Sequence, residues 1–295
     1  IPYINVGETL NQGIDANLEY SQKISNVFVT ARGNFTYNRN KMINNDDPDW
    51  EYKYQNRIGK PFGSYGSVQP FGLKALGLFA SQEEIDNSPK QTYGEYRVGD
   101  IRYQDINGDG VIDSQDEVAL GYTNMPEIVY GFGATAQWKN WDFNVFFQGV
   151  AHTSFFLAGA SLRSPFSSGS MERSAVNEDI YGNVWMSTNT PEQNDRAIYP
   201  RLSLSNQAGS SNNNQTSDWW LRDGSFLRLK NFEIGYTLPK KLLGKNFIRS
   251  LRFYVAANNL LTFCNFKLWD PEKGSSDGSG YPLNRVVTLG FNINL

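Results

Sequence analysis

The sequence ends in Val287-Thr-Leu-Gly-Phe-Asn-Ile-Asn-Leu295, a stretch in which apolar and polar side chains alternate strictly. Successive side chains of a β-strand point to opposite faces of a sheet, so this period of two predicts a strand with one apolar and one polar face. The apolar face would carry Val287, Leu289, Phe291, Ile293 and Leu295, and the polar face Thr288, Gly290, Asn292 and Asn294.

Six further segments show the same alternation, and each has roughly the length of a tilted strand that crosses a bilayer. In the segment near residue 230, the apolar positions change phase between Leu229 and Phe232. A β-bulge near Lys230-Asn231 would account for the change, and so would a strand that leaves the bilayer there. The six segments are residues 14–20, 27–37, 130–138, 141–147, 226–237 and 251–261.

The connections between these segments alternate in length. Short connections cover residues 21–25, 139–140 and 239–250, whereas long ones cover residues 38–127, 150–224 and 262–285. A transmembrane β-barrel has short turns on its periplasmic side and long loops outside, so we expect the three long connections to be extracellular. Trp138 and Trp141 flank the shortest connection, where amphipathic rings would lie at the periplasmic interface.

A soluble β-sandwich with one wet face would alternate in the same way. The aromatic-rich apolar faces and the long loops favour the barrel over the sandwich.

The mean hydropathy is negative, and no apolar run has the length of a membrane-spanning helix. Seven strands cannot close a barrel, and an open edge in lipid would leave several backbone groups unpaired, each at a cost of several kcal/mol. With Ile1 at its start, the sequence is therefore expected to be a processed or partial chain.

Composition excludes several classes of function. The chain has 27 Lys and Arg against 30 Asp and Glu, so no basic excess indicates a nucleic-acid ligand. Cys264 and His152 are the only residues of their types, which excludes an internal disulfide and a zinc cluster of Cys and His. No HExxH or GxSxG motif surrounds His152, and we expect no enzymatic activity.

The residues from Asp105 to Asp116 have the spacing of an EF-hand calcium loop. Four carboxylates in so short a stretch repel one another unless a cation neutralises them. We expect a structural Ca²⁺ ion that stabilises a long outer loop, although Asp116 has a shorter arm than the usual Glu and the flanks do not read as paired helices. The alternative is a turn rich in Asp and Asn that holds no ion. The expected ligands are Asp105, Asn107, Asp109, the Val111 carbonyl, Asp113 and Asp116.

Three loop segments carry local signals. Ser81-Gln-Glu-Glu84 predicts a capping box that opens a short helix. Residues 203–217, rich in Ser and Asn, predict an exposed loop tip, and residues 273–282 predict a flexible outer loop. The aromatic residues of the loops could stack on sugars or peptides, but for most of them we expect packing between loops: Tyr65, Phe71, Phe79, Tyr93, Tyr96, Phe155, Phe156, Phe166, Tyr181, Trp185, Trp219, Trp220 and Trp269.

A series of motifs along essentially the whole chain resembles the C-terminal half of SusC/RagA-like TonB-dependent outer-membrane transporters. The chain departs from the pattern of many outer-membrane barrels at Leu295, where these have a terminal aromatic residue. The motifs are Asn5-Val-Gly-Glu8 with Asn11-Gln-Gly-Ile14, Ser81-Gln-Glu-Glu-Ile-Asp86, Gly99-Asp-Ile-Arg-Tyr-Gln-Asp-Ile-Asn-Gly-Asp-Gly-Val-Ile-Asp113, Tyr130-Gly-Phe132, Phe146-Phe-Gln-Gly149, Trp220-Leu-Arg-Asp-Gly-Ser-Phe-Leu-Arg-Leu-Lys-Asn231, Gly235-Tyr-Thr-Leu-Pro239, Asn258-Asn-Leu260 and Gly280-Tyr-Pro-Leu283.

The resemblance implies an all-β fold, in which residues 1–295 form the C-terminal part of an antiparallel transmembrane barrel of about 22 strands. It also implies an N-terminal plug and a TonB-binding region that this chain lacks, and a SusD-like lipoprotein over the outer mouth. The implied function is the TonB-dependent import of oligosaccharides or peptides across the bacterial outer membrane, where the wall contacts lipid.

Two rival functions follow from the same residues. The first is a secreted, calcium-stapled β-rich module for glycan binding or adhesion. The second is a surface hydrolase, which a loss of bond cleavage on substitution of Asp113 or Glu172 would support.

Overall fold

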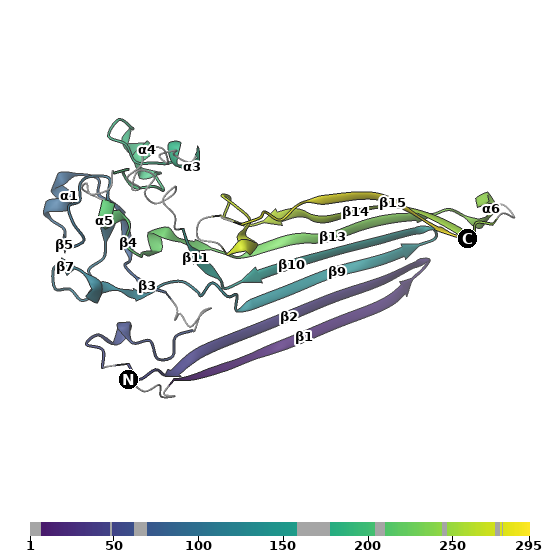
Figure 1. Ribbon diagram of the computed structural model, residues 1–295, viewed down its shortest axis with the longest axis horizontal. Coiled ribbons are helices and arrows are strands. Elements are labelled where there is room, and N and C mark those ends of the chain that lie inside the picture. Colours follow the sequence, from purple (N-terminus) through teal and green to yellow (C-terminus); the bar gives the residue numbers. More distant parts are fainter. Residues whose placement is uncertain are drawn as a thin grey trace.

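The computed structural model describes residues 7–47, 49–61, 70–157, 178–203, 210–243, 247–274, 278 and 280–295. One large antiparallel sheet of seven long strands runs along the molecule, and smaller sheets and short helices gather at one of its ends (Figure 1). All seven predicted strands are present. They are β1 (Glu8–Ile24), β2 (Val27–Asn44), β9 (Ile128–Trp138), β10 (Trp141–Ala151), β13 (Phe226–Thr237), β14 (Ser250–Phe263) and β15 (Val286–Asn294).

Strand order in the sheet follows chain order, and every neighbouring pair is antiparallel. Two connections are tight turns, at residues 25–26 and 139–140, and their first residues Ser25 and Lys139 have φ angles of 55° and 53°. The predicted connection at 21–25 is wrong, because backbone pairing continues to Ile24 opposite Val27. Strand β2 likewise continues to Asn44, beyond the predicted loop start at residue 38.

The register of the sheet separates apolar from polar side chains. Phe143, Ile234, Val255 and Leu289 lie side by side on four neighbouring strands. Across the sheet this apolar face is open to the surroundings, with Leu18 75% and Leu289 79% exposed. In the described residues the apolar side chains therefore do not pack against a second sheet, as a β-sandwich would require.

The phase change near residue 230 is a β-bulge, which confirms one of the two predicted explanations. On β10, Phe146 and Phe147 are consecutive, but their partners on β13 are Asn231 and Leu229, so Lys230 has no partner in this register. The extra residue returns Leu227 and Leu229 to the apolar face beside Phe232 and Ile234.

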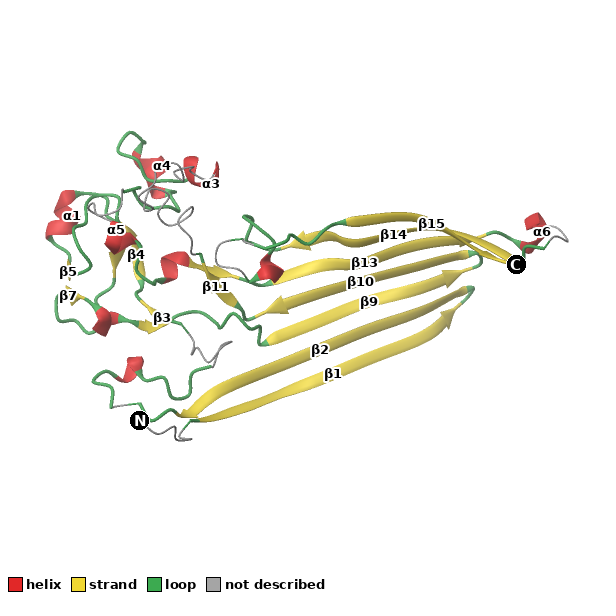
Figure 2. Ribbon diagram, in the orientation of Figure 1, coloured by secondary structure: helices red, strands yellow, loops and turns green. Residues whose placement is uncertain are grey.

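The long connections fold together into a second body, the loop body, at the end of the sheet opposite the tight turns (Figure 2). Four pairs of short strands belong to it: β3 (Phe71–Gly72) with β8 (Val118–Ala119), β4 (Ala75–Leu78) with β6 (Ile101–Tyr103), β5 (Lys90–Gln91) with β7 (Val111–Ile112), and β11 (Ser154–Phe156) with β12 (Leu221–Asp223). Its short helices are η1 (Lys53–Gln55), α1 (Gln82–Asp86), η3 (Ser114–Asp116), α3 (Glu178–Tyr181), α4 (Pro191–Asp195), α5 (Ser210–Asn213), η5 (Asp218–Trp220) and η6 (Pro271–Lys273). A further helix, α6 (Lys240–Leu243), lies at the tight-turn end.

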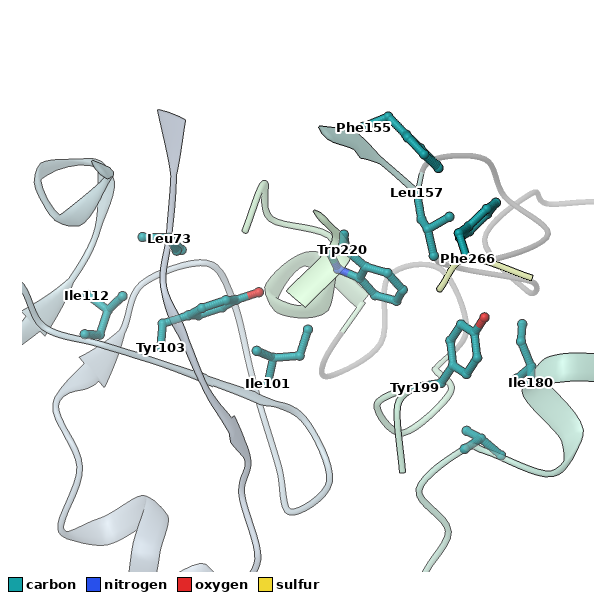
Figure 3. Packing of buried hydrophobic residues seen from close by; sticks show 11 residues of the cluster. Leu73, Ile101, Tyr103, Ile112, Phe155, Leu157, Ile180, Tyr199, Trp220 and Phe266 are labelled. Carbon is teal, nitrogen blue, oxygen red and sulfur yellow. The ribbon is translucent and has the colours of Figure 1, made fainter. Parts of the chain in front are cut away.

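All three long connections contribute to the apolar core of the loop body. Trp220 is fully buried among side chains from each of them (Figure 3). The first connection supplies Ile101 and Tyr103, the second Leu157, and the third Phe266. Among the described residues, no helix has the length and apolar character needed to cross a membrane.

A matched pair of substitutions on β15 tests the two faces of the sheet. Leu289→Lys places a charge on the apolar face, and we expect it to destabilise the protein by about 2–4 kcal/mol in a bilayer. Thr288→Lys places the same charge on the polar face, opposite Ala256, and should be tolerated. Unfolding in phospholipid vesicles measures both, and equal losses would contradict the assignment of the faces.

Candidate functional site

An ion cluster lies on the polar face of the sheet, near its tight-turn end. The Arg252 Nη2 atom is 2.5 Å from both Asp142 Oδ2 and Glu233 Oε1, and its Nε atom donates to Asp142 Oδ1 at 3.0 Å. These three residues come from β14, β10 and β13, so the cluster bridges three neighbouring strands. Gly235 leaves space for the guanidinium, because a Cβ atom there would lie 2.4 Å from Arg252 Nη2 and would displace it.

The polar face also has an open hollow of about 630 Å³, lined by residues of β1, β2, β10 and β13. The Arg32 guanidinium lies 5.0 Å from the centre of the Phe146 ring, a cation–π contact. Gly133 provides space for that ring, since a Cβ atom there would lie 2.8 Å from it. Asn17, Glu19, Asn34 and Asn231 also line the hollow, so this part of the wall offers both charges and amides to a polar ligand.

In the loop body, Asp100 joins the first long connection to the second. Its carboxylate is fully buried and accepts hydrogen bonds from Arg201 Nη2 and Asn213 Nδ2, both at 2.9 Å. The Asn213 side chain in turn accepts a bond from the Ile101 backbone amide at 2.9 Å. A buried carboxylate is stable in this position because a guanidinium and an amide satisfy both of its oxygens.

The prediction that residues 203–217 form an exposed tip is wrong at three positions, whereas Ser211 and Thr216 are exposed as predicted. Asn212 and Asn213 of α5 are buried, as is Ser217, whereas residues 204–209 lie outside the described residues. Asn212 is bonded to Gln91 Nε2 at 2.7 Å, and its own amide donates to the Ile101 carbonyl at 2.9 Å. Composition alone misled the prediction, because an Asn side chain that satisfies a buried backbone has the same sequence signal as one in solvent.

A further polar contact stabilises the second connection. The Tyr199 hydroxyl donates to Asp179 Oδ2 at 2.7 Å. Burial raises the pKa of Tyr199 well above its ordinary value, and the bond to Asp179 raises it further. The tyrosine therefore stays protonated and remains a hydrogen-bond donor at any physiological pH.

The loop from Asp105 to Asp116 is closed by its own hydrogen bonds. Asp105 accepts the amides of Gly108 and Gly110 at 2.6 and 2.9 Å, and Asp109 accepts that of Val111 at 2.8 Å. Asp116 is fully buried and accepts the amides of Ile106 and Asp113 at 2.7 and 2.9 Å. Among the residues that the structure describes, no three His, Cys, Asp or Glu side chains converge as a metal cluster.

The early members of the predicted calcium-ligand set lie beside one another in the loop. Asn107 Nδ2 lies 2.9 Å from Asp109 Oδ2, so these two predicted ligands are adjacent. The Gly110 and Ile112 carbonyls accept bonds from the Lys90 and Thr92 amides, so the Val111 carbonyl points to the other side of β7. Asp113 caps η3 by accepting the Gln115 amide at 2.7 Å. The Asp116 carboxylate already accepts the amides of Ile106 and Asp113.

His152 contacts an acidic and an aromatic side chain. Its Nδ1 atom lies 3.1 Å from Glu127 Oε2, and its ring stacks on Tyr122 at 4.5 Å between ring centres. Arg39 contacts the other oxygen of Glu127 at 3.5 Å. Glu172, the residue considered for the hydrolase alternative, lies outside the described residues.

The capping prediction at Ser81 is half confirmed. The Ser81 hydroxyl accepts the Glu84 amide at 3.2 Å and opens α1, but the Glu84 carboxylate takes the Ala80 amide rather than that of Ser81.

Packing is the role of several loop aromatic residues, as predicted. Phe79, Phe155 and Trp220 are buried, whereas Tyr181 is 81% exposed. Tyr65 and Phe166 lie outside the described residues.

A two-faced antiparallel sheet with an exposed apolar side and a charged inner side is the architecture of a β-barrel wall segment. No protein-family model matches the chain. Among curated proteins, it is 33% identical over 236 residues to TonB-dependent receptor P26 of Formosa agariphila, which covers 75% of this chain and 22% of that protein. It is 23% identical over 296 residues to TonB-dependent receptor SusC of Bacteroides thetaiotaomicron, covering 98% of this chain and 27% of that protein.

Solved structures with a similar fold include a protein of the same kind. The RagAB peptide transporter aligns with a TM-score of 0.67 and 23% identity, covering 98% of this chain and 30% of that chain. The chain therefore spans less than a third of the length of these proteins. It is a segment of a SusC/RagA-like TonB-dependent transporter, as the sequence motifs predict.

Sequence reasoning did not single out the Arg252 cluster or the Asp100–Arg201 pair. The alternation already places Asp142 and Glu233 on the polar face, but only the folded sheet shows that Arg252 contacts both. The Asp100–Arg201 pair leaves no local signal, because its members are a hundred residues apart.

Removal of the Asn213 side chain should loosen the loop body. Asn213→Ala deprives buried Asp100 and the Ile101 amide of partners, which we expect to cost about 1–3 kcal/mol. Native-state proteolysis of the loop body should speed up accordingly. Ser211→Ala, an exposed change on the same helix, is the control, and equal cleavage rates for the two variants would contradict the role of Asn213.

Proposed function

We propose that this chain forms the C-terminal part of the barrel of an outer-membrane importer that is driven through TonB. The observation that carries the proposal is the two-faced sheet, whose apolar side is exposed on strand after strand while its other side carries Arg32, Asp142, Glu233 and Arg252. Hydrocarbon is the medium that suits the first face, and a water-filled lumen suits the second.

The edges of the sheet indicate that this wall needs further strands. Among the described residues, β1 pairs only with β2, and β15 pairs only with β14. A closed barrel satisfies both edges, and the family resemblance supplies about 22 strands for it. A barrel of this width would leak without a plug, and the plug and the TonB-binding region would belong to the N-terminal part of the protein.

The transported substrate is an oligosaccharide or a peptide, and a SusD-like lipoprotein covers the outer mouth. The relatives support this proposal in general terms, since SusC is a TonB-dependent receptor and RagAB is a peptide transporter. The polar hollow around Arg32 and Asn34 offers charges and amides that either ligand class could use.

A secreted glycan-binding module is the alternative. It would need a cover for the apolar face, because an exposed patch of this extent causes association in water. The described residues provide no such cover, and the importer is therefore the better-supported function.

The importer proposal is tested on the full-length protein in its own bacterium. We expect it to fractionate with the outer membrane and to migrate faster on gels before heating than after it. Deletion of its gene or of tonB should abolish growth on the oligosaccharide or peptide that it imports, and the lipoprotein should copurify with it. A freely soluble product would overturn the importer and favour the secreted module.

We also propose that the loop from Asp105 to Asp116 binds a structural Ca²⁺ ion through its early oxygen ligands. Asp105, Asn107, Asp109 and the Val111 carbonyl support this, because oxygen donors of this kind suit a hard cation. The ion would neutralise the repulsion among the carboxylates of the loop.

Asp109→Ala should release the ion and make the loop more susceptible to protease. Elemental analysis after dialysis against dilute calcium measures the metal, with Asp86→Ala, an exposed acid on α1, as the matched control. Wild-type protein that contains no calcium would refute the proposal, and so would full retention of calcium by Asp109→Ala.

A further inference from the structure

The connection between β13 and β14 differs from the other two turns at its end of the sheet. Those are two residues long, at 25–26 and 139–140, whereas this one runs from Leu238 to Arg249. Its sequence contains no Asp or Glu. Lys240, Lys241 and Arg249 are all exposed, and they are the charged residues of the described part of the connection.

Two large apolar side chains on the same connection are also exposed. Leu242 is 71% and Phe247 is 78% exposed. We call the group formed by Lys240, Lys241, Leu242, Phe247 and Arg249 the basic turn. Exposed leucine and phenylalanine between cations are typical of segments that lie in the headgroup region of a membrane.

The base of the basic turn is fixed to the sheet. The Leu238 amide donates to the Leu251 carbonyl at 2.8 Å, and the Arg249 amide donates to the Asn294 carbonyl at 2.7 Å. Within the turn, the Leu242 amide donates to the Pro239 carbonyl at 2.9 Å. Helix α6 consequently projects beyond the ends of the strands, as Figure 1 shows.

The basic turn directly continues the aromatic border of the apolar face. Trp141, Tyr236 and Phe253 occupy one row of the register at this end of the sheet, and the Trp141 and Tyr236 rings are 4.7 Å apart. Aromatic rings of this kind mark the level where hydrocarbon meets the headgroups. Tyr236 precedes the turn and Phe253 follows it, so the turn begins and ends at headgroup level.

We propose that the basic turn binds anionic phospholipids of the periplasmic leaflet. Lys240, Lys241 and Arg249 would contact lipid phosphates, while Leu242 and Phe247 enter the boundary between glycerol and acyl chains. The inference rests on the proposed function, since it needs the apolar face to lie in a membrane. The charge of the turn and its continuity with that face favour lipid over an acidic soluble protein.

The test uses the full-length transporter purified in detergent, with phosphatidylglycerol and phosphatidylcholine as probes. Native mass spectrometry measures the affinity for each lipid at low and high salt. Wild-type protein should prefer phosphatidylglycerol. The triple variant Lys240→Gln, Lys241→Gln, Arg249→Gln should bind phosphatidylglycerol roughly tenfold to a hundredfold more weakly, with no change for phosphatidylcholine.

A matched triple variant controls for net charge. Lys53→Gln, Lys74→Gln, Lys90→Gln removes three exposed cations from the loop body and should leave lipid binding unchanged. The double variant Leu242→Ser, Phe247→Ser should weaken the binding of both lipids and retain the salt dependence. Heat-modifiable migration checks that every variant has folded.

Equal affinity of the wild type for both lipids would overturn the inference, and so would undiminished phosphatidylglycerol binding by the basic-turn variant. Competition by soluble polyglutamate as effective as that by phosphatidylglycerol would assign the turn to an acidic protein partner instead. If the wild type lacked heat-modifiable migration, the proposed function itself would fail. A folded barrel without lipid preference would remove only the present inference.

Discussion

Backbone hydrogen bonding is the constraint on which the rest of the structure depends. Hydrocarbon offers no partner for an N–H or C=O group, so a wall in lipid is stable only if each strand is paired on both sides. Five of the seven long strands meet this condition within the described residues, and β1 and β15 meet it on one side only. The uniform antiparallel pairing, the tight turns and the need for further strands all follow from this one requirement.

The cost of polar groups in hydrocarbon also explains why the charged side chains of the sheet lie on one of its faces. A charged side chain in lipid is costly, whereas Arg252 with its two carboxylates is stable on the face that a lumen would hydrate. Glycine at 235 and 133 allows large side chains to lie flat across neighbouring strands. On the polar face, the Arg252 charge is thus paired across neighbouring strands with Asp142 and Glu233.

The strands could be predicted from the sequence, and the loop body could not. Alternation in 287–295 or 141–147 reports directly on the environment of a two-faced strand, and even the bulge at Lys230 leaves a visible change of phase. Strand ends at Ile24 and Asn44 were missed because pairing continues where the apolar pattern weakens. In the loops, Asn212 and Asn213 are buried by contacts with distant residues, and no local pattern records such contacts. The calcium-loop motif is visible in the sequence because its spacing is local, and calcium binding there stays a prediction.

The link between Asp100 and Arg201 bears on how the outer end of the molecule moves. It ties together two connections that leave the sheet from different strand pairs, and Trp220 lies in a core shared by all three connections. A pull on one connection is therefore transmitted to the others. The loop body is therefore built to move as one unit, not as three independent loops.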